Sequence, residues 1–136
     1  MFLGEYKLNF TGKGRVILPK KMRDEVNGQQ IVLSRGFEGC IFGYDMESWE
    51  KEAEKQLEIS ATEERARYLR RYMFSASVSV ELDSQGRFVI PSALLIYAEL
   101  GREIVIIGAG DHFEIWNNKF WKKHLKQIEG DYGRVS

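Results

Sequence analysis

The chain carries one short motif twice, and this internal repeat constrains the fold more than any other feature of the sequence. Residues 14–19 read Gly-Arg-Val-Ile-Leu-Pro, and residues 86–91 read Gly-Arg-Phe-Val-Ile-Pro. The spacing is 72 positions, counted from Arg15 to Arg87, and the same ungapped shift pairs Trp49 with Trp121. Self-similarity at a fixed offset predicts two copies of one structural unit.

Each copy is expected to begin with a β-hairpin whose turn carries the arginine. Apolar and polar residues alternate over 6–10 and over 76–82, which predicts half-buried strands. The short apolar runs 15–18 and 87–90 predict the second strand of each hairpin. The glycine before each arginine suits a turn position with positive φ.

The remainder of each copy is expected to be a short helix, a second hairpin and a longer helix. The expected short helices span 19–26 and 91–100, and the expected later strands span 30–34, 40–44, 103–107 and 112–116. Asp45 can cap one longer helix, and Asn117 or Asn118 another. Ser60 and Glu63 have the spacing of a capping box for a further helix.

Length and composition predict one globular unit in which both halves share a core. The chain has 136 residues, 43% apolar and 29% charged, and a half of this size is marginal alone. Cys40 is the only cysteine, so no intrachain disulfide is possible and a reducing compartment is expected. Without a signal peptide or an apolar span in the sequence, we expect a cytoplasmic protein that does not enter membranes.

Charge is segregated along the chain although 20 basic residues balance 20 acidic ones. Residues 13–23 contain five cations and no acid, whereas residues 45–64 contain eight acids and two lysines. Segregated charge can create a strong local potential on a neutral protein. In the matching segment of the second copy, residues 85–96, Arg87 is the only cation. The first copy is therefore the better candidate for a phosphate contact.

The sequence contains no recognisable catalytic constellation. His112 and His124 lack metal-ligand spacing with Cys40, so we expect neither a metal site nor another cofactor, and no small-molecule substrate is evident. Asp83, at the start of the second turn, is expected to accept hydrogen bonds from turn amides or from Arg87. Each repeated arginine therefore has two open interpretations: a contact residue, or a partner of a nearby carboxylate.

The duplicated unit resembles the MraZ family of bacterial transcriptional regulators over nearly the whole chain. That family carries an Asp-x-x-x-Arg signature in each half. Residues 83–87 keep it as Asp-Ser-Gln-Gly-Arg, whereas residues 11–15 read Thr-Gly-Lys-Gly-Arg. Thr11 can cap the turn through its hydroxyl but removes a negative charge from the basic loop.

The resemblance implies an α+β fold of the AbrB and SpoVT class, a duplicated swapped-hairpin β-barrel of the double-split type with short flanking helices. It implies a first repeat at 1–58, a connecting helix at 59–73, a second repeat at 74–130 and a loose tail at 131–136. It also implies a ring-shaped homo-oligomer that binds direct repeats in double-stranded DNA. Such a protein represses its own operon, the division and cell-wall gene cluster, and associates with the nucleoid.

A two-stranded β-ribbon can enter the major groove, and arginine is the residue most often found bidentate to guanine. Arg15 and Arg87 are therefore the expected base-reading residues, and Lys13 and the later cations the expected phosphate contacts. The full set of expected DNA-binding residues is Thr11, Lys13, Gly14, Arg15, Lys20, Lys21, Arg23, Asp83, Gln85, Gly86 and Arg87. The alternative is a non-enzymatic homo-oligomeric scaffold whose arginine loops contact protein, and an enzyme is a distant third.

Overall fold

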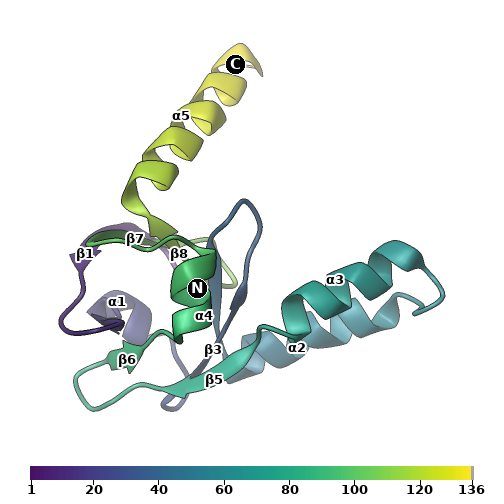
Figure 1. Cartoon of the computed structure of the whole chain (residues 1–136), viewed down its shortest axis with the longest axis horizontal. Helices are drawn as coiled ribbons and strands as arrows, with labels where there is room; N and C mark the ends of the chain where they lie inside the picture. Colours follow the sequence, from purple (N-terminus) through teal and green to yellow (C-terminus); the bar gives the residue numbers. More distant parts are fainter. Residues whose placement is uncertain (136) are drawn as a thin grey trace.

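The strands form one six-stranded sheet and one two-stranded ribbon in the computed structural model, which describes residues 1–135 and side chains as far as residue 132. The sheet has the order β1-β7-β8-β4-β3-β5, and β2 pairs with β6. Every neighbouring pair is antiparallel, so the fold is mixed α+β, as expected. The elements, drawn in Figure 1, are β1 (Glu5–Asn9), β2 (Arg15–Ile17), α1 (Lys20–Arg23), β3 (Gln30–Arg35), β4 (Ile41–Asp45), α2 (Met46–Glu58), α3 (Glu64–Phe74), β5 (Val78–Glu81), β6 (Arg87–Val89), α4 (Ser92–Tyr97), β7 (Glu103–Gly108), β8 (Phe113–Asn117) and α5 (Asn118–Val135).

The first strand of each half pairs with the other half of the chain. β1 lies against β7, with Glu5 opposite Ile107, and β5 lies against β3, with Gln30 opposite Glu81. The predicted hairpins of 6–10 with 15–18 and of 76–82 with 87–90 are therefore wrong. A tight turn predicts that two strands follow one another, but it does not determine which strands pair. The chain diverges after a single bridge between Gly12 and Arg15.

The two halves are related by a pseudo-twofold axis that passes through the ribbon. Val16 lies opposite Phe88, its own equivalent after the repeat shift. In the large sheet, Phe42 lies opposite Glu114, which is again its equivalent. Only positions close to a twofold axis can face their own equivalents, so the sequence repeat is also a spatial repeat.

Apolar side chains fill both sides of the large sheet, which explains the nearly continuous apolar runs in β3, β4 and β7. One cluster joins the sheet to the ribbon, α1 and α4, and contains Val16, Phe88, Met22, Leu94, Ile31 and Ile106. A second cluster, under α2, α3 and α5, contains Tyr44, Trp116, Met73 and Trp121. Both clusters draw on both halves, so the halves share their core as expected.

The predicted caps of the two longer helices are confirmed. Asp45 accepts a hydrogen bond from the Ser48 amide at 2.8 Å, and the side-chain oxygen of Asn117 accepts one from the Lys119 amide at 2.9 Å. The capping box predicted from Ser60 and Glu63 is wrong. Ser60 accepts from the Thr62 amide at 3.2 Å, and this local turn leaves α3 without a side-chain cap.

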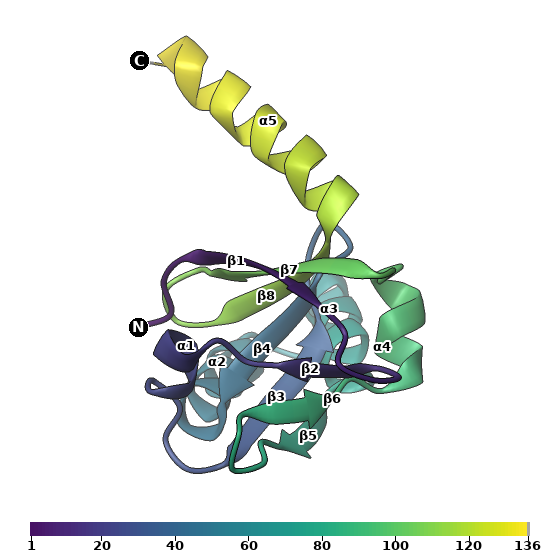
Figure 2. The same cartoon turned by 90° about the vertical axis from the view of Figure 1, so that its left-hand side faces the viewer.

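Three helices differ in length from expectation. α1 is a single turn over 20–23 and α4 ends at Tyr97, so both are shorter than predicted. α5 continues through Gly130 and Gly133 to Val135, where a loose tail was expected, because each glycine costs a helix only about 1 kcal/mol. Across the described residues, no helix has an apolar stretch long enough to cross a membrane. Figures 1 and 2 show α5 extending away from the sheet, in a different direction from the α2–α3 pair.

Candidate nucleic-acid interface

The outer face of the ribbon presents both repeated arginines. Val16 and Phe88 point inward and are buried, so their neighbours along β2 and β6 point outward. Arg15 lies opposite Val89, and Arg87 lies opposite Ile17. The two arginines are therefore diagonal neighbours across the ribbon. The Cα atoms of such a pair in antiparallel strands lie about 7–8 Å apart.

The turns that carry the arginines have the same backbone design. The Thr11 amide donates to the Arg15 carbonyl at 2.9 Å, and the Asp83 amide donates to the Arg87 carbonyl at 2.9 Å. Gly14 and Gly86 have φ of 69° and 80°, which only glycine adopts without strain. The carbonyls of these glycines accept amides of the other half, Leu18 for Gly86 and Ile90 for Gly14, at 2.9 and 2.8 Å.

Asp83 organises the second turn, as predicted. Its Oδ1 accepts the amides of Gln85 and Arg87, both at 2.9 Å, and its Oδ2 accepts Nε–H of Arg87 at 2.6 Å. The hydrogen bond from the Arg87 amide, followed by the one from the Arg87 side chain, holds the pKa of Asp83 below its usual range. The pairing with a nearby carboxylate is thus confirmed for Arg87.

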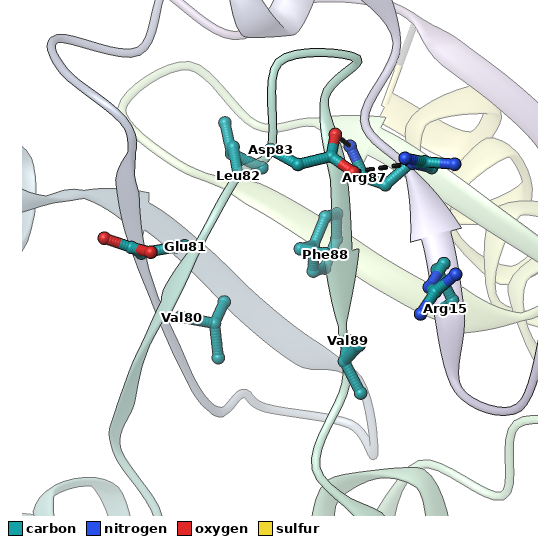
Figure 3. A pocket seen from close by; sticks show the side chains of 8 residues that line it. All are labelled: Arg15, Val80, Glu81, Leu82, Asp83, Arg87, Phe88 and Val89. Atoms are coloured by element: carbon teal, nitrogen blue, oxygen red, sulfur yellow. Dashed lines mark hydrogen bonds and ion pairs between the residues drawn. The ribbon is translucent and has the colours of Figure 1, made fainter.

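The ion pair leaves the distal part of Arg87 available. Asp83 binds Nε, and within the described residues neither Nη group of Arg87 has a hydrogen-bond partner. These two groups form the fork that can donate to guanine or to a phosphate. Figure 3 shows the pair among the side chains that line one pocket, with Arg15 on the neighbouring strand.

The first turn lacks this organisation. Thr11 occupies the position of the carboxylate, and its hydroxyl makes one long hydrogen bond to the Arg15 carbonyl at 3.4 Å. The side chain of Arg15 is exposed and forms no ion pair or hydrogen bond within residues 1–132. The alternative of a carboxylate partner therefore does not hold for Arg15 in this structure.

Arg23 lies against the second turn, although the sequence places it near the first. A Cβ on Gly86 would lie 2.0 Å from Cδ of Arg23, so Gly86 provides the space for this side chain. The equivalent of Arg23 in the second half is Leu95, whose Cδ1 would lie 3.3 Å from a Cβ on Gly14. One turn therefore lies on a cation and the other on an apolar side chain.

The basic segment 13–23 is divided between the two turns. Lys13 and Arg15 belong to the first turn. β2 runs from Arg15 toward Arg87, so α1, which follows β2 and carries Lys20 and Lys21, lies beside the second turn. Lys20 pairs with Asp24 at 3.4 Å, and Lys21 is exposed. Strand pairing carries α1 across the pseudo-twofold axis, so only Lys13 and Arg15 of this segment lie at the first turn. The preference for the first copy as the phosphate contact stays a prediction.

A depression of about 450 Å³ adjoins the two arginines. It includes apolar residues that the sequence analysis did not assign to the site, notably Val80 and Val89. The alternation of inward and outward residues along β6 places Val89 on the outward face with Arg87. This alternation could have indicated that Val89 belongs to the site. It could not indicate that β2 is the strand that completes the outward face.

The described residues contain no group of three or more His, Cys, Asp or Glu side chains placed to hold a metal ion. His112 binds two carboxylates instead, Asp111 through Nδ1 at 2.7 Å and Glu114 through Nε2 at 2.9 Å. Burial lowers the pKa of His112, but the hydrogen bonds to Glu114 and Asp111 outweigh burial and raise it. Cys40 is buried, and desolvation raises the pKa of its thiol.

A family model described as "MraZ protein, putative antitoxin-like" matches residues 1–72 and again residues 73–132. The chain belongs to the MraZ family. The two matches to the MraZ model reproduce the spacing of the repeat, so each half is recognised separately.

Two relatives, each named "Transcriptional regulator MraZ", align with the chain over its whole length. The relative from Halothermothrix orenii (strain H 168 / OCM 544 / DSM 9562) is 42% identical over 136 residues, which are all of this chain and 94% of the relative. The relative from Lactobacillus helveticus (strain DPC 4571) is 40% identical over 136 residues, again all of this chain and 94% of the relative.

Proposed function

We propose that this chain is a sequence-specific DNA-binding transcriptional regulator that contacts double-stranded DNA with the ribbon β2–β6 and its two turns. The names of the two relatives support regulation of transcription. The observation that carries the proposal is the outward pair of arginines on the ribbon. The guanidinium of Arg15 has no partner within residues 1–132, and Arg87 keeps its two Nη groups free of partners there.

In this proposal the ribbon enters the major groove, where a two-stranded β-ribbon fits. Arg15 and Arg87 contact base edges, while Lys13 at the first turn and α1 at the second contact phosphates and fix the position of the protein. Asp83 holds Arg87 in a defined orientation, and Gln85 is an exposed donor and acceptor in the same turn. Thr11, Gly14 and Gly86 shape the turns that present these groups.

We further propose the assembly and the target that the family resemblance implies. The ribbon and the sheet together form a swapped-hairpin barrel of the double-split type, with repeats at 1–58 and 74–130. Copies assemble into a ring that binds direct repeats upstream of its own operon, represses that operon and associates with the nucleoid. A ring would present the arginine turns at fixed spacing, so linked weak contacts gain affinity through effective concentration.

The test is a binding titration on DNA from upstream of this protein's gene, with scrambled DNA for comparison, across a series of salt concentrations. Arg15→Ala and Arg87→Ala should each weaken specific binding by about 1–3 kcal/mol if they read bases. If either contacts a phosphate instead, its variant should flatten the log-log salt slope by about 1. Arg65→Ala, which removes an exposed arginine of α3, is the matched control and should bind as wild type does. Equal affinity of wild type for upstream and scrambled DNA would contradict the proposal.

The alternative function is a homo-oligomeric scaffold whose arginine turns contact protein. It is favoured by the apolar residues between the arginines, because Ile17 and Val89 are 37% and 50% exposed on the same face. In that case Arg15→Ala would change the sedimentation of the protein and leave its affinity for DNA unchanged.

A further inference from the structure

Helices α2 and α5 are equivalent elements of the two halves but carry opposite charges. α2 begins at Met46 and α5 at Asn118, which is the spacing of the repeat, and both position an inward tryptophan in their first turn. At three equivalent positions the acidic residue of α2 is replaced by a lysine of α5. These pairs are Glu47 and Lys119, Glu50 and Lys122, and Glu54 and Lys126.

The inverted positions form one continuous stripe on each helix. Spacings of three and four residues place side chains on the same helical face, and all six side chains are exposed. Lys51 and Lys123 are equivalent lysines on the same faces, but Lys51 pairs with Glu47 at 3.5 Å. Within residues 1–132, Glu50 and Glu54 are therefore the acids of the α2 stripe that form no ion pair. The stripe on α2 has net negative charge, and the stripe on α5 is wholly basic over 119–126.

Both helices expose apolar side chains: Leu57 near the C-terminal end of α2 is 55% exposed, and α5 exposes Phe120 and Tyr132. Beside α2, Trp49 packs edge to face on Phe74 of α3, with ring centroids 5.9 Å apart. α5 extends beyond the sheet (Figures 1 and 2), and its Phe120 and Tyr132 are 41% and 71% exposed. Tyr132 continues the face of Trp121, Leu125 and Ile128, at spacings of four, three and four residues. The apolar face of α5 therefore extends beyond the part that packs on the sheet.

We propose that α5 of one copy binds α2 of a second copy, with the lysine stripe against the glutamate stripe. Within one chain α2 and α5 point in different directions (Figure 1). Within residues 1–132, none of the lysines of 119–126 forms an ion pair. Contacts of α2 with α2, or of α5 with α5, would place like charges together, which is unfavourable. The contact is therefore heterologous, and such contacts generate rings when the rotation closes. This inference rests on the homo-oligomer proposed above, but not on DNA binding.

The experiment uses paired charge reversals and sedimentation velocity without DNA. One variant carries Glu50→Lys and Glu54→Lys, and the other carries Lys122→Glu and Lys126→Glu, since within residues 1–132 none of these four side chains forms a hydrogen bond or ion pair. Each variant alone should assemble at least about tenfold more weakly than wild type. An equimolar mixture should assemble more strongly than either variant alone, because α5 of the first variant is still basic and α2 of the second is still acidic.

A control variant reverses Arg65 and Arg71, two exposed arginines of α3, and should sediment as wild type does. Circular dichroism should report the same helix content for all variants. The interface is overturned if wild type is monomeric, if either reversed variant assembles normally, or if the mixture fails to assemble. The same holds if Lys122→Glu with Lys126→Glu weakens DNA binding without changing assembly, because those lysines would then be phosphate contacts.

Failure of this interface can be distinguished from failure of the proposed function. The reversed variants keep both arginine turns, so they should bind a short duplex with one repeat as wild type does. They should lose affinity selectively on duplexes with several repeats, where linked contacts matter. An unchanged multi-repeat affinity in a variant that no longer assembles would contradict the role of this interface in DNA binding.

Discussion

The two arginine turns have one backbone and two different electrostatic environments. In the second turn, Asp83 binds two amides and the guanidinium of Arg87, and Arg23 lies under Gly86. In the first turn, no carboxylate binds Arg15 within residues 1–132, and Leu95 lies under Gly14. The second turn is therefore preorganised, whereas the arginine of the first remains free to adjust.

This difference shows that a repeated fold need not repeat its chemistry. The backbone bonds across the pseudo-twofold axis, between Leu18 and Gly86 and between Ile90 and Gly14, are nearly identical in length. The side chains around them are not. A preorganised arginine loses little entropy when it binds, while an adjustable one can follow variation in its target.

The largest effects are expected from the glycines that shape the turns. Gly14→Ala and Gly86→Ala each force a side chain to positive φ, at about 1–2 kcal/mol of unfolding free energy. Gly86→Ala should also displace Arg23. Adding Arg23→Ala should therefore restore part of the unfolding free energy that Gly86→Ala removes. Adding Arg23→Ala to Gly14→Ala should restore none. Urea denaturation of the two double variants measures this. Equal relief at both turns would contradict the separate environments.

A smaller effect is expected from His112, which is the equivalent of Cys40 in the other half. Because the pKa of His112 is raised in the folded state, its stabilisation is full below the unfolded pKa of about 6.5 and is lost as pH rises through the folded value. Unfolding free energy should therefore fall as pH rises from about 6.5. His112→Gln should abolish this change, and His124→Gln, the control, should retain it.

The next effect is the loss of unfolding free energy at acidic pH, which should differ between the two turns. The pKa of Asp83 is lowered in the folded state, so its stabilisation is present above the unfolded value of about 3.9 and is lost as pH falls below it. Asp83→Asn should flatten the pH dependence of stability in that range. Thr11→Asp should steepen it, because a carboxylate in the first turn can accept the same amides. No change for Thr11→Asp would mean that the first turn cannot adopt the geometry of the second.

The smallest effects on stability are expected from the arginines themselves. Arg15→Ala removes an exposed side chain without a partner within residues 1–132, so unfolding free energy should change by no more than about 0.5 kcal/mol. Arg87→Ala removes the partner of Asp83 and should destabilise slightly more. Thermal unfolding of the two variants at neutral pH compares them. A larger loss for Arg15→Ala would indicate a contact that this structure lacks.

The repeat and the local patterns predicted most elements of the fold. Alternation and short apolar runs located the strands, and the caps at Asp45 and Asn117 followed from residue type. The pairing of β1 with β7 was not predictable in this way. Apolar alternation determines which face of a strand is buried, but two halves with the same pattern offer equally suitable partners.

The site was predicted in part for the same reason. The bond between Asp83 and Arg87 is local, since both lie in one turn, and the sequence indicated it correctly. The contact between Arg23 and Gly86 joins different halves, and no local pattern predicts it. The sequence predicted a strand over 87–90 but assigned no face to Val89, and the position of Val89 opposite Arg15 became known only from the strand register.

The pairing of each first strand with the opposite half has a consequence for synthesis on the ribosome. β1 emerges first, yet its partner β7 is among the last strands to be made, and β3 must wait for β5. Contacts between residues so distant in sequence slow folding, and unpaired strand edges are prone to aggregate. Strands β2 and β4 likewise wait for β6 and β8. The nascent chain therefore holds unpaired edges on all four strands of its first half until its second half leaves the exit tunnel, and it completes its sheet only after translation has nearly ended.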